Sequence, residues 1–158
     1  MDLTKDEIGR HMKRCIELAK TGQKIANKYL TGALVLSSNG TVVGEGYNKF
    51  LDRTHYTLHA DRVAIDQADT EARGGTLITT LEPCVAKPSG SDMFKPCCEL
   101  IVERGIAKVI IGSYHTGYHS YKIKTNGATN YMKNHGIEVV SYRNFESFIR
   151  HELVKPNL

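Results

Sequence analysis

The sequence contains no tryptophan, only 8% aromatic residues and no basic run, and its 158 residues carry a formal net charge of only +4. Nucleic-acid-binding proteins usually carry a strongly basic patch, and those that hold single strands add aromatic side chains on which bases stack. These absences argue against nucleic acid as the main partner. The mild positive charge suits a small anionic molecule.

Long apolar segments are also missing. No stretch approaches the ~20 apolar residues that a membrane-spanning helix needs, and the first residues, Met1 to Lys5, include no apolar core of a secretion signal. There are no repeats and no linker-like segment. With 41% apolar and 24% charged residues, the composition is typical of a soluble globular protein. We therefore expect one domain over residues 1–158 and a cytoplasmic location.

Cysteine is scarce, since the chain has four: Cys15, Cys84, Cys97 and Cys98. Two of them are adjacent, which is a poor arrangement for disulfides. In a reducing cytosol, clustered cysteine and histidine indicate metal binding or catalysis before they indicate disulfides. Cys15 falls on the apolar stripe of a predicted helix, where core packing is the default interpretation.

The apolar pattern predicts a helix, then a hairpin, then alternating helices and strands. Asn39-Gly40 is a strong hairpin signal, Thr4 and Glu7 form a plausible capping box, and Gly74-Gly75 ends a helix. The predicted helices cover 5–28, 57–72, 97–104, 128–135 and 144–153, and the predicted strands cover 33–37, 41–47, 76–81, 108–111 and 137–141.

This order of elements predicts an α/β domain with a mixed sheet and helices on both faces. The last two strands should be parallel, because a helix at 128–135 connects them and parallel neighbours require such a crossover. Residues 48–56, 83–96 and 113–126 are interpreted as loops.

Three segments combine the residue types of a metal site: Leu58-His59-Ala60-Asp61, Leu81-Glu82-Pro83-Cys84 and Lys95-Pro96-Cys97-Cys98. His59 opens a predicted helix, Cys84 follows a strand, and Cys97 begins another helix, whose amides and dipole stabilise a thiolate. One imidazole and two thiolates leave a fourth tetrahedral position open for water. That arrangement is typical of catalytic zinc, which lowers the pKa of its bound water.

These motifs resemble those of the zinc-dependent nucleobase deaminases, whose signature is H-x-E followed by P-C and a second Cys. Within that superfamily the chain is most similar to the riboflavin-pathway pyrimidine deaminases. The similarity covers residues 10–142, and the pieces that carry it are Thr80-Leu81-Glu82-Pro83-Cys84, Pro96-Cys97 and Asn134-His135-Gly136-Ile137-Glu138-Val139. It implies a cytidine-deaminase-like fold, which is a three-layer α/β/α sandwich around a five-stranded mixed sheet.

The resemblance also implies the site residues. Zinc would be held by His59, Cys84 and Cys97, and Pro96 favours Cys97 over its neighbour Cys98 for this role. In the family the carboxylate two residues after the histidine is not a ligand, and it transfers protons between the attacking water and the ring. In this sequence that residue is Asp61.

The sequence departs from the family pattern in two places. Asp61 replaces the family Glu and is shorter by about 1.5 Å, and a misplacement of about 1 Å near the chemistry can lower a rate on the order of a hundredfold. A zinc-binding pseudoenzyme or scaffold subunit therefore stays open as an alternative. Twelve residues separate Cys84 from Cys97, which is longer than P-C-x-x-C and favours the riboflavin-type branch.

Three further residues are predicted to bind substrate. Asn48 ends a strand where relatives place a polar residue against the substrate, although an Asx turn would explain it as well. His115 and Lys122 belong to the segment Tyr114 to Lys124, which follows a strand and contains three Tyr, two His and two Lys. Ligands collect at such strand ends, but a solvated surface loop or a subunit contact would use the same residues.

We therefore expect a zinc-dependent hydrolase that removes an exocyclic amine from a pyrimidine-like ring. The leading substrate is the diaminopyrimidine ribityl phosphate of riboflavin synthesis, and the chain would act without a reductase domain. The alternatives are a deaminase of another nucleobase, nucleoside or secondary-metabolite heterocycle, and the pseudoenzyme. Relatives commonly form dimers or tetramers, so the resemblance implies a homo-oligomer.

Overall fold

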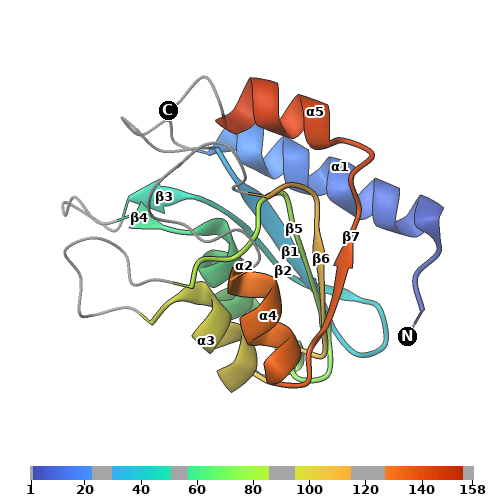
Figure 1. Cartoon of the computed structure of the whole chain (residues 1–158), viewed down its shortest axis with the longest axis vertical. Helices are drawn as coiled ribbons and strands as arrows, with labels where there is room; N and C mark the ends of the chain where they lie inside the picture. Colours follow the sequence, from blue (N-terminus) through green and yellow to red (C-terminus); the bar gives the residue numbers. More distant parts are fainter. Residues whose placement is uncertain (1, 23–29, 51–56, 86–94, 115–126, 155–158) are drawn as a thin grey trace.

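The computed structural model describes residues 2–22, 30–50, 57–85, 95–114 and 127–154, and it places a central sheet between two layers of helices (Figure 1). The five strands of the sheet are β1 (Gly32–Leu36), β2 (Val42–Tyr47), β5 (Thr76–Thr79), β6 (Lys108–Ile111) and β7 (Glu138–Ser141). The helices are α1 (Lys5–Thr21), α2 (Ala60–Ala68), α3 (Cys97–Glu103), α4 (Gly127–Asn134) and α5 (Glu146–Phe148), which continues as a π-helical segment, Ile149–Val154.

The strand order is β2-β1-β5-β6-β7. β1 is antiparallel to both β2 and β5, whereas β5, β6 and β7 are parallel to one another. The predicted five-stranded mixed sheet and the parallel pairing of its last two strands are therefore confirmed. The hairpin at Asn39-Gly40 is confirmed as well, and Gly40 adopts the positive φ of 91° that its turn requires.

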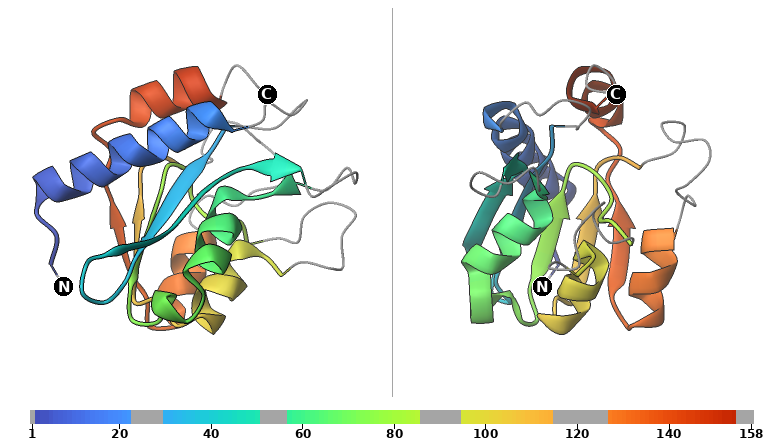
Figure 2. Two further views of the ribbon diagram at one scale, coloured as in Figure 1. Left: turned by 180° about the vertical axis from the view of Figure 1, so that it is seen from behind. Right: turned by 90° about the vertical axis from the view of Figure 1, so that its left-hand side faces the viewer.

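Helices cover both faces of the sheet (Figure 2), and an apolar layer lies between the helices and the sheet on each face. α1 and the C-terminal helical segment cover one face, where Met12, Cys15, Ile78 and Ile149 are fully buried. The other face is covered by α2, α3 and α4. Every residue of β1 is buried, as expected for a strand covered on both sides. This arrangement confirms the predicted three-layer α/β/α sandwich.

Two glycines in β2 allow α2 to lie directly on the sheet. A Cβ atom at Gly44 would lie 2.1 Å from the carbonyl oxygen of Ala64, and one at Gly46 would lie 2.5 Å from that of Ala60. Real Cβ atoms essentially never approach other heavy atoms so closely. The absence of side chains at these positions therefore sets the height of α2 above the sheet, and with it the place of the first turn of α2.

Several predicted boundaries were wrong. The first helix ends at Thr21 and not at 28, because Gly22 caps it with extended backbone. The segment 48–56 was predicted as a loop and 57–72 as a helix, but β3 (Lys49–Phe50) pairs with β4 (Thr57–Leu58). α2 therefore begins only at Ala60. It continues beyond Ala68 as a 3₁₀ turn, Asp69–Ala72.

The capping box at the start of α1 is confirmed. The Thr4 hydroxyl accepts the Glu7 backbone N–H at 3.1 Å, and the Glu7 carboxylate accepts the Thr4 backbone N–H at 2.7 Å. Among the described residues, no helix has both the length and the apolar character needed to cross a membrane.

Candidate metal centre and active site

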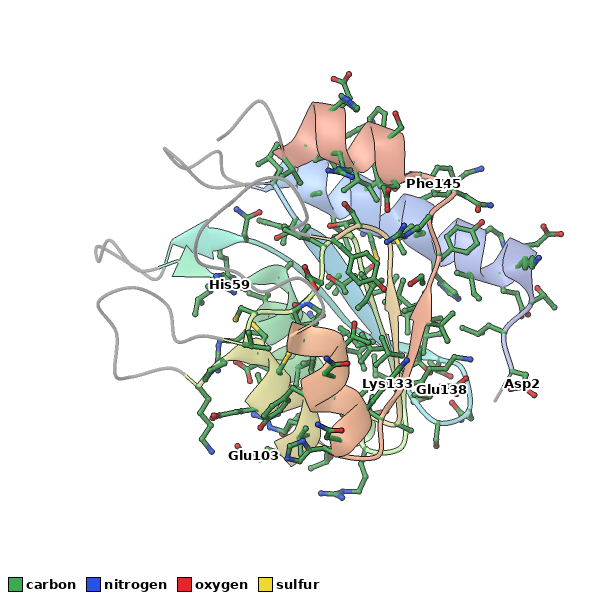
Figure 3. The ribbon with its side chains drawn as sticks, in the orientation of Figure 1. Asp2, His59, Glu103, Lys133, Glu138 and Phe145 are labelled. Carbon is green, nitrogen blue, oxygen red and sulfur yellow. The ribbon has the colours of Figure 1, made fainter. Side chains whose placement is uncertain are left out.

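The fold brings together the three predicted ligands from three separate elements. His59 is the N-cap of α2, Cys84 lies in the turn after β5, and Cys97 is the first residue of α3. One ligand atom from each of the three residues lies within 4.8 Å of the other two. Figure 3 shows His59 at the start of α2, on the side where α3 lies.

The backbone at the start of α3 holds the two cysteines in register. The Cys97 N–H donates to Cys84 Sγ at 3.2 Å, and the Cys98 N–H donates to the Cys84 carbonyl oxygen at 3.1 Å. Cys97 Sγ lies 3.5 Å from His59 Nδ1. The first amides of a helix have no partner within the helix, and here two of them fix the turn that carries Cys84.

The electrostatics of the two thiols fit a divalent cation. The hydrogen bond from the Cys97 side chain, with help from His59, lowers the pKa of Cys84 to about 4. The contact with Cys84, together with burial, raises the pKa of Cys97 well above its usual value. The Cys84 and Cys97 thiols therefore cannot both lose their protons easily, because two neighbouring thiolates repel each other. A cation bound to both sulfur atoms removes that repulsion and stabilises both thiolates. An imidazole and two thiolates are the donor set of zinc.

Asp61 lies beside these three residues but is not part of the cluster. It is in the first turn of α2 and is only 5% exposed. Burial raises the pKa of Asp61 to about 6, although the Thr79 hydroxyl and His59 lower it. Its Oδ1 atom is buried without a hydrogen-bond partner among the described residues. Such an atom in a folded protein calls for an explanation, and a ligand or a reacting group beside the carboxylate is one.

Cys98, the competing cysteine, packs into the core. It is 1% exposed, and its thiol donates to the Pro83 carbonyl oxygen at 3.8 Å. Its Sγ atom is not among the clustered ligand atoms. Cys15 is fully buried on the side of α1 that packs against the sheet, and its thiol donates to the Ile78 carbonyl oxygen at 3.4 Å. It belongs to the core layer on the face of the sheet opposite α2 and α3.

Asn48 lies buried at the end of β2, with 3% of its surface exposed. Its side-chain carbonyl accepts the Thr31 N–H at 2.9 Å, which ties the end of β2 to the start of β1. The bond reaches across to another segment and so is not the local contact of an Asx turn. His115 and Lys122, the other two predicted substrate-binding residues, lie outside the described residues.

Tyr114 is the only residue of the tyrosine-rich segment that the structure describes. It is 8% exposed, its hydroxyl lies 2.5 Å from the Ser141 hydroxyl, and the Arg143 guanidinium lies 4.9 Å from its ring centroid. These contacts tie the end of β6 to β7.

Two residues near the site were not predicted from sequence. The Arg62 guanidinium donates to the Lys95 carbonyl oxygen, which links α2 to the segment that leads into Cys97. Thr79, on the middle strand of the sheet, lowers the pKa of Asp61. A charged residue on a helix usually faces solvent, so Arg62 offered no signal. Thr79 offered no signal either, since it is one of two threonines among the four residues of β5.

With this geometry in view, comparison with known proteins identifies the family. The model of the cytidine and deoxycytidylate deaminase zinc-binding region matches residues 5–113. A diaminohydroxyphosphoribosylamino-pyrimidine deaminase of Buchnera aphidicola subsp. Acyrthosiphon pisum is 33% identical over 127 residues, which cover 80% of this chain and 78% of that protein. The chain therefore belongs to the cytidine and deoxycytidylate deaminase family, and within it lies close to the riboflavin-pathway deaminases.

Two longer relatives support the same placement. The riboflavin biosynthesis protein RibD of Actinobacillus pleuropneumoniae is 33% identical over 82% of this chain, which spans 31% of that protein. The crystal structure of a diaminohydroxyphosphoribosylaminopyrimidine deaminase/5-amino-6-(5-phosphoribosylamino)uracil reductase from Thermotoga maritima superposes with a TM-score of 0.70 at 32% identity. The match covers 92% of this chain and 39% of the Thermotoga protein.

Proposed function

We propose that this chain is a zinc-dependent hydrolytic deaminase of a phosphorylated diaminopyrimidine of riboflavin synthesis. One observation carries the proposal: His59, Cys84 and Cys97 place their ligand atoms within 4.8 Å of one another, and Asp61 lies buried beside them, its Oδ1 atom without a hydrogen-bond partner among the residues that the structure describes. A site with three protein ligands leaves a position open for a small molecule, whereas a structural zinc site is closed by four.

His59, Cys84 and Cys97 would hold the ion. When bound, zinc would supply a Lewis acid that lets water be deprotonated near neutral pH. Asp61 accepts the proton of the attacking water at its carboxylate, and then donates that proton to the exocyclic nitrogen as ammonia leaves. Both transfers use the Asp61 carboxylate. Asp61 suits this role because it is buried next to the three ligands and does not itself belong to the ligand cluster.

The choice of substrate rests on the relatives. The Buchnera protein is named for a phosphoribosylamino-pyrimidine, while the sequence motifs led us to the ribityl phosphate, so both forms belong in the test. We propose that Asn48, His115 and Lys122 contact the substrate. What supports Asn48 is that it is buried directly after β2, the strand that packs against α2.

We further propose that the chain forms one domain over residues 1–158 and acts in the cytoplasm as a homo-oligomer with a small-molecule substrate. Nucleic acid is not proposed as a partner, because the net charge is only +4. Light scattering coupled to size-exclusion chromatography tests the oligomer. A monomeric mass at micromolar concentration would contradict it.

The experiment for the function is ammonia release by the zinc-loaded protein on a panel of amines. The panel holds both phosphorylated diaminopyrimidines, cytosine, cytidine, deoxycytidylate, adenine and guanine. Turnover of a diaminopyrimidine, with loss of turnover in Asp61→Asn, is the expected result. Turnover of another amine instead would overturn the substrate. Zinc binding without turnover on any amine, unchanged in Asp61→Glu, would favour the scaffold alternative.

A further inference from the structure

Two of the three candidate ligands are carried by helices that are distant in sequence. His59 caps the start of α2 and Cys97 begins α3, and the two helices lie side by side on one face of the sheet (Figure 1). The hydrogen bonds at the start of α3 hold Cys97 and Cys84 in register with each other. They leave the position of His59 relative to the two cysteines to the contacts between α2 and α3.

Arg62 makes one of these contacts close to the ligands. It is a half-buried residue that follows His59 by three positions, in the first turn of α2. That turn is closed by the Val63 N–H, which donates to the His59 carbonyl oxygen at 3.1 Å. The Arg62 guanidinium donates to the backbone carbonyl oxygen of Lys95, two residues before Cys97. A single side chain thus joins the turn that carries one ligand to the segment that carries another.

The Lys95 carbonyl group is rigidly connected to the start of α3. It forms a planar peptide bond with Pro96, whose ring also restricts its own backbone φ. The Pro96 carbonyl oxygen in turn accepts the N–H groups of Glu99 and Leu100, at 3.0 and 3.2 Å, and so belongs to the first turn of α3. Few soft torsions separate the Lys95 carbonyl oxygen from Cys97. A bond that fixes this oxygen therefore restricts where Cys97 can lie.

We propose that Arg62 is a positioning residue that sets the separation between His59 and Cys97 and so prepares the ligands for zinc. This inference rests on the metal site of the proposed function. A guanidinium suits the task because it is a planar group with several N–H donors, whereas a carbonyl oxygen only accepts. Ligands that are already in place bind without the cost of ordering them. Groups that orient metal ligands typically change metal affinity by about 10- to 100-fold.

A purely structural role for Arg62 predicts different behaviour, and Arg104 offers the comparison. Arg104 also links α3 to α2, since its guanidinium pairs with Asp66 Oδ1 at 3.1 Å, but it is the C-cap of α3, at the end opposite Cys97. If Arg62 only held the two helices together, loss of either arginine would act alike on zinc affinity. A positioning role predicts that zinc affinity depends on Arg62 far more than on Arg104.

The test measures the zinc Kd of the full chain by competition with a chelating dye. We expect Arg62→Met to raise the Kd about tenfold to a hundredfold. Arg104→Met and Lys95→Ala should change it by less than about threefold, because Lys95→Ala removes an ammonium that pairs with the exposed Glu103 but keeps the carbonyl oxygen. An unchanged Kd in Arg62→Met, or an equal rise in Arg104→Met, would overturn the proposal.

Two further variants show how Arg62 acts. In a Cys97→Ala background Arg62→Met should leave the weakened zinc affinity unchanged, because no Cys97 thiolate is left to place, and an equal effect in both backgrounds would reject the role. Arg62→Lys keeps the charge but loses the planar set of donors, so full wild-type affinity in this variant would assign the effect to charge and overturn the positioning role.

The zinc measurement also separates this inference from the proposed function, because it does not depend on turnover. Zinc binding that weakens in Arg62→Met, in a protein without deaminase activity, would support the role of Arg62 and reject the deamination. Deaminase activity with an unchanged Kd in Arg62→Met would reject the role of Arg62 alone. A wild-type chain that binds no zinc would reject both.

Discussion

Replacing Gly46 by alanine should disturb the metal centre from outside it, by pushing α2 away from the sheet. A Cβ atom at Gly46 would lie 2.5 Å from the Ala60 carbonyl oxygen and 2.7 Å from the Ala64 nitrogen, whereas ordinary contact begins at 3.4 Å. These atoms belong to the backbone and cannot rotate aside. In a close-packed interior α2 must therefore retreat by roughly 0.9 Å, and His59 and Asp61 move with it.

The expected effect is large on activity and moderate on stability. A shift of about 1 Å near the reacting atoms can lower a rate on the order of a hundredfold, and overpacking typically lowers the free energy of unfolding by ~1–3 kcal/mol. Ammonia release and chemical denaturation of the zinc-loaded protein measure the two effects. Gly127→Ala is the control, since among the described residues its Cβ atom would meet only Val85 Cγ2, at an ordinary contact distance of 3.7 Å. Wild-type kcat and stability in Gly46→Ala would refute the reasoning.

Three further predictions follow from single contacts. Cys84→Ser should lower bound zinc well below one per chain by elemental analysis, and an unchanged zinc content would exclude Cys84 as a ligand. Burial raises the pKa of the Cys15 thiol, so iodoacetamide should leave Cys15 unmodified in the native protein at neutral pH and modify it in denaturant. Rapid native labelling would contradict this. The hydrogen bond from Arg14 lowers the pKa of Glu45 in the folded protein. This partly exposed ion pair therefore stabilises the fold when the pH is above the pKa of glutamate in the unfolded chain. The stabilisation disappears as the pH falls through the pKa of Glu45 in the folded protein. Glu45→Gln should thus lower the free energy of unfolding by ~0.2–1 kcal/mol at neutral pH and by nothing in acid, and a deficit independent of pH would count against it.

The parts of the fold that could be predicted from sequence are those with local signals. Thr4 and Glu7 mark the start of α1, and Asn39-Gly40 marks the hairpin, because each motif makes its own hydrogen bonds. The short strands β3 and β4 could not be predicted, since they exist only through pairing with each other. The end of α1 at Gly22 was missed because the helical pattern of the sequence continues beyond it.

The residues of the candidate site also fall into two groups, those that could be predicted from sequence and those that could not. His59, Cys84 and Cys97 could be named from sequence because their residue types at element boundaries are unusual, and the structure brings their ligand atoms together. Thr79 and Arg62 could not be named, because their partners are remote in the chain. Thr79 acts on the pKa of Asp61 from a strand of the sheet, and Arg62 donates to the backbone of Lys95.

The distance between α2 and the sheet could not be predicted from sequence either, and the glycines of β2 show why. In a sequence, Gly44 and Gly46 weaken a strand. In the structure they allow the backbone of α2 to approach the sheet. This role becomes visible only when the position of α2 above these two glycines is known.

The most direct test of a zinc-dependent deaminase is a zinc titration of metal-free protein, with ammonia release from the phosphorylated diaminopyrimidine followed at each step. Wild-type protein should release ammonia in proportion to bound zinc up to one ion per chain, while Asp61→Asn should bind the same zinc and release almost none. Full zinc occupancy without ammonia release by the wild type, or equal release by Asp61→Asn, would contradict the account.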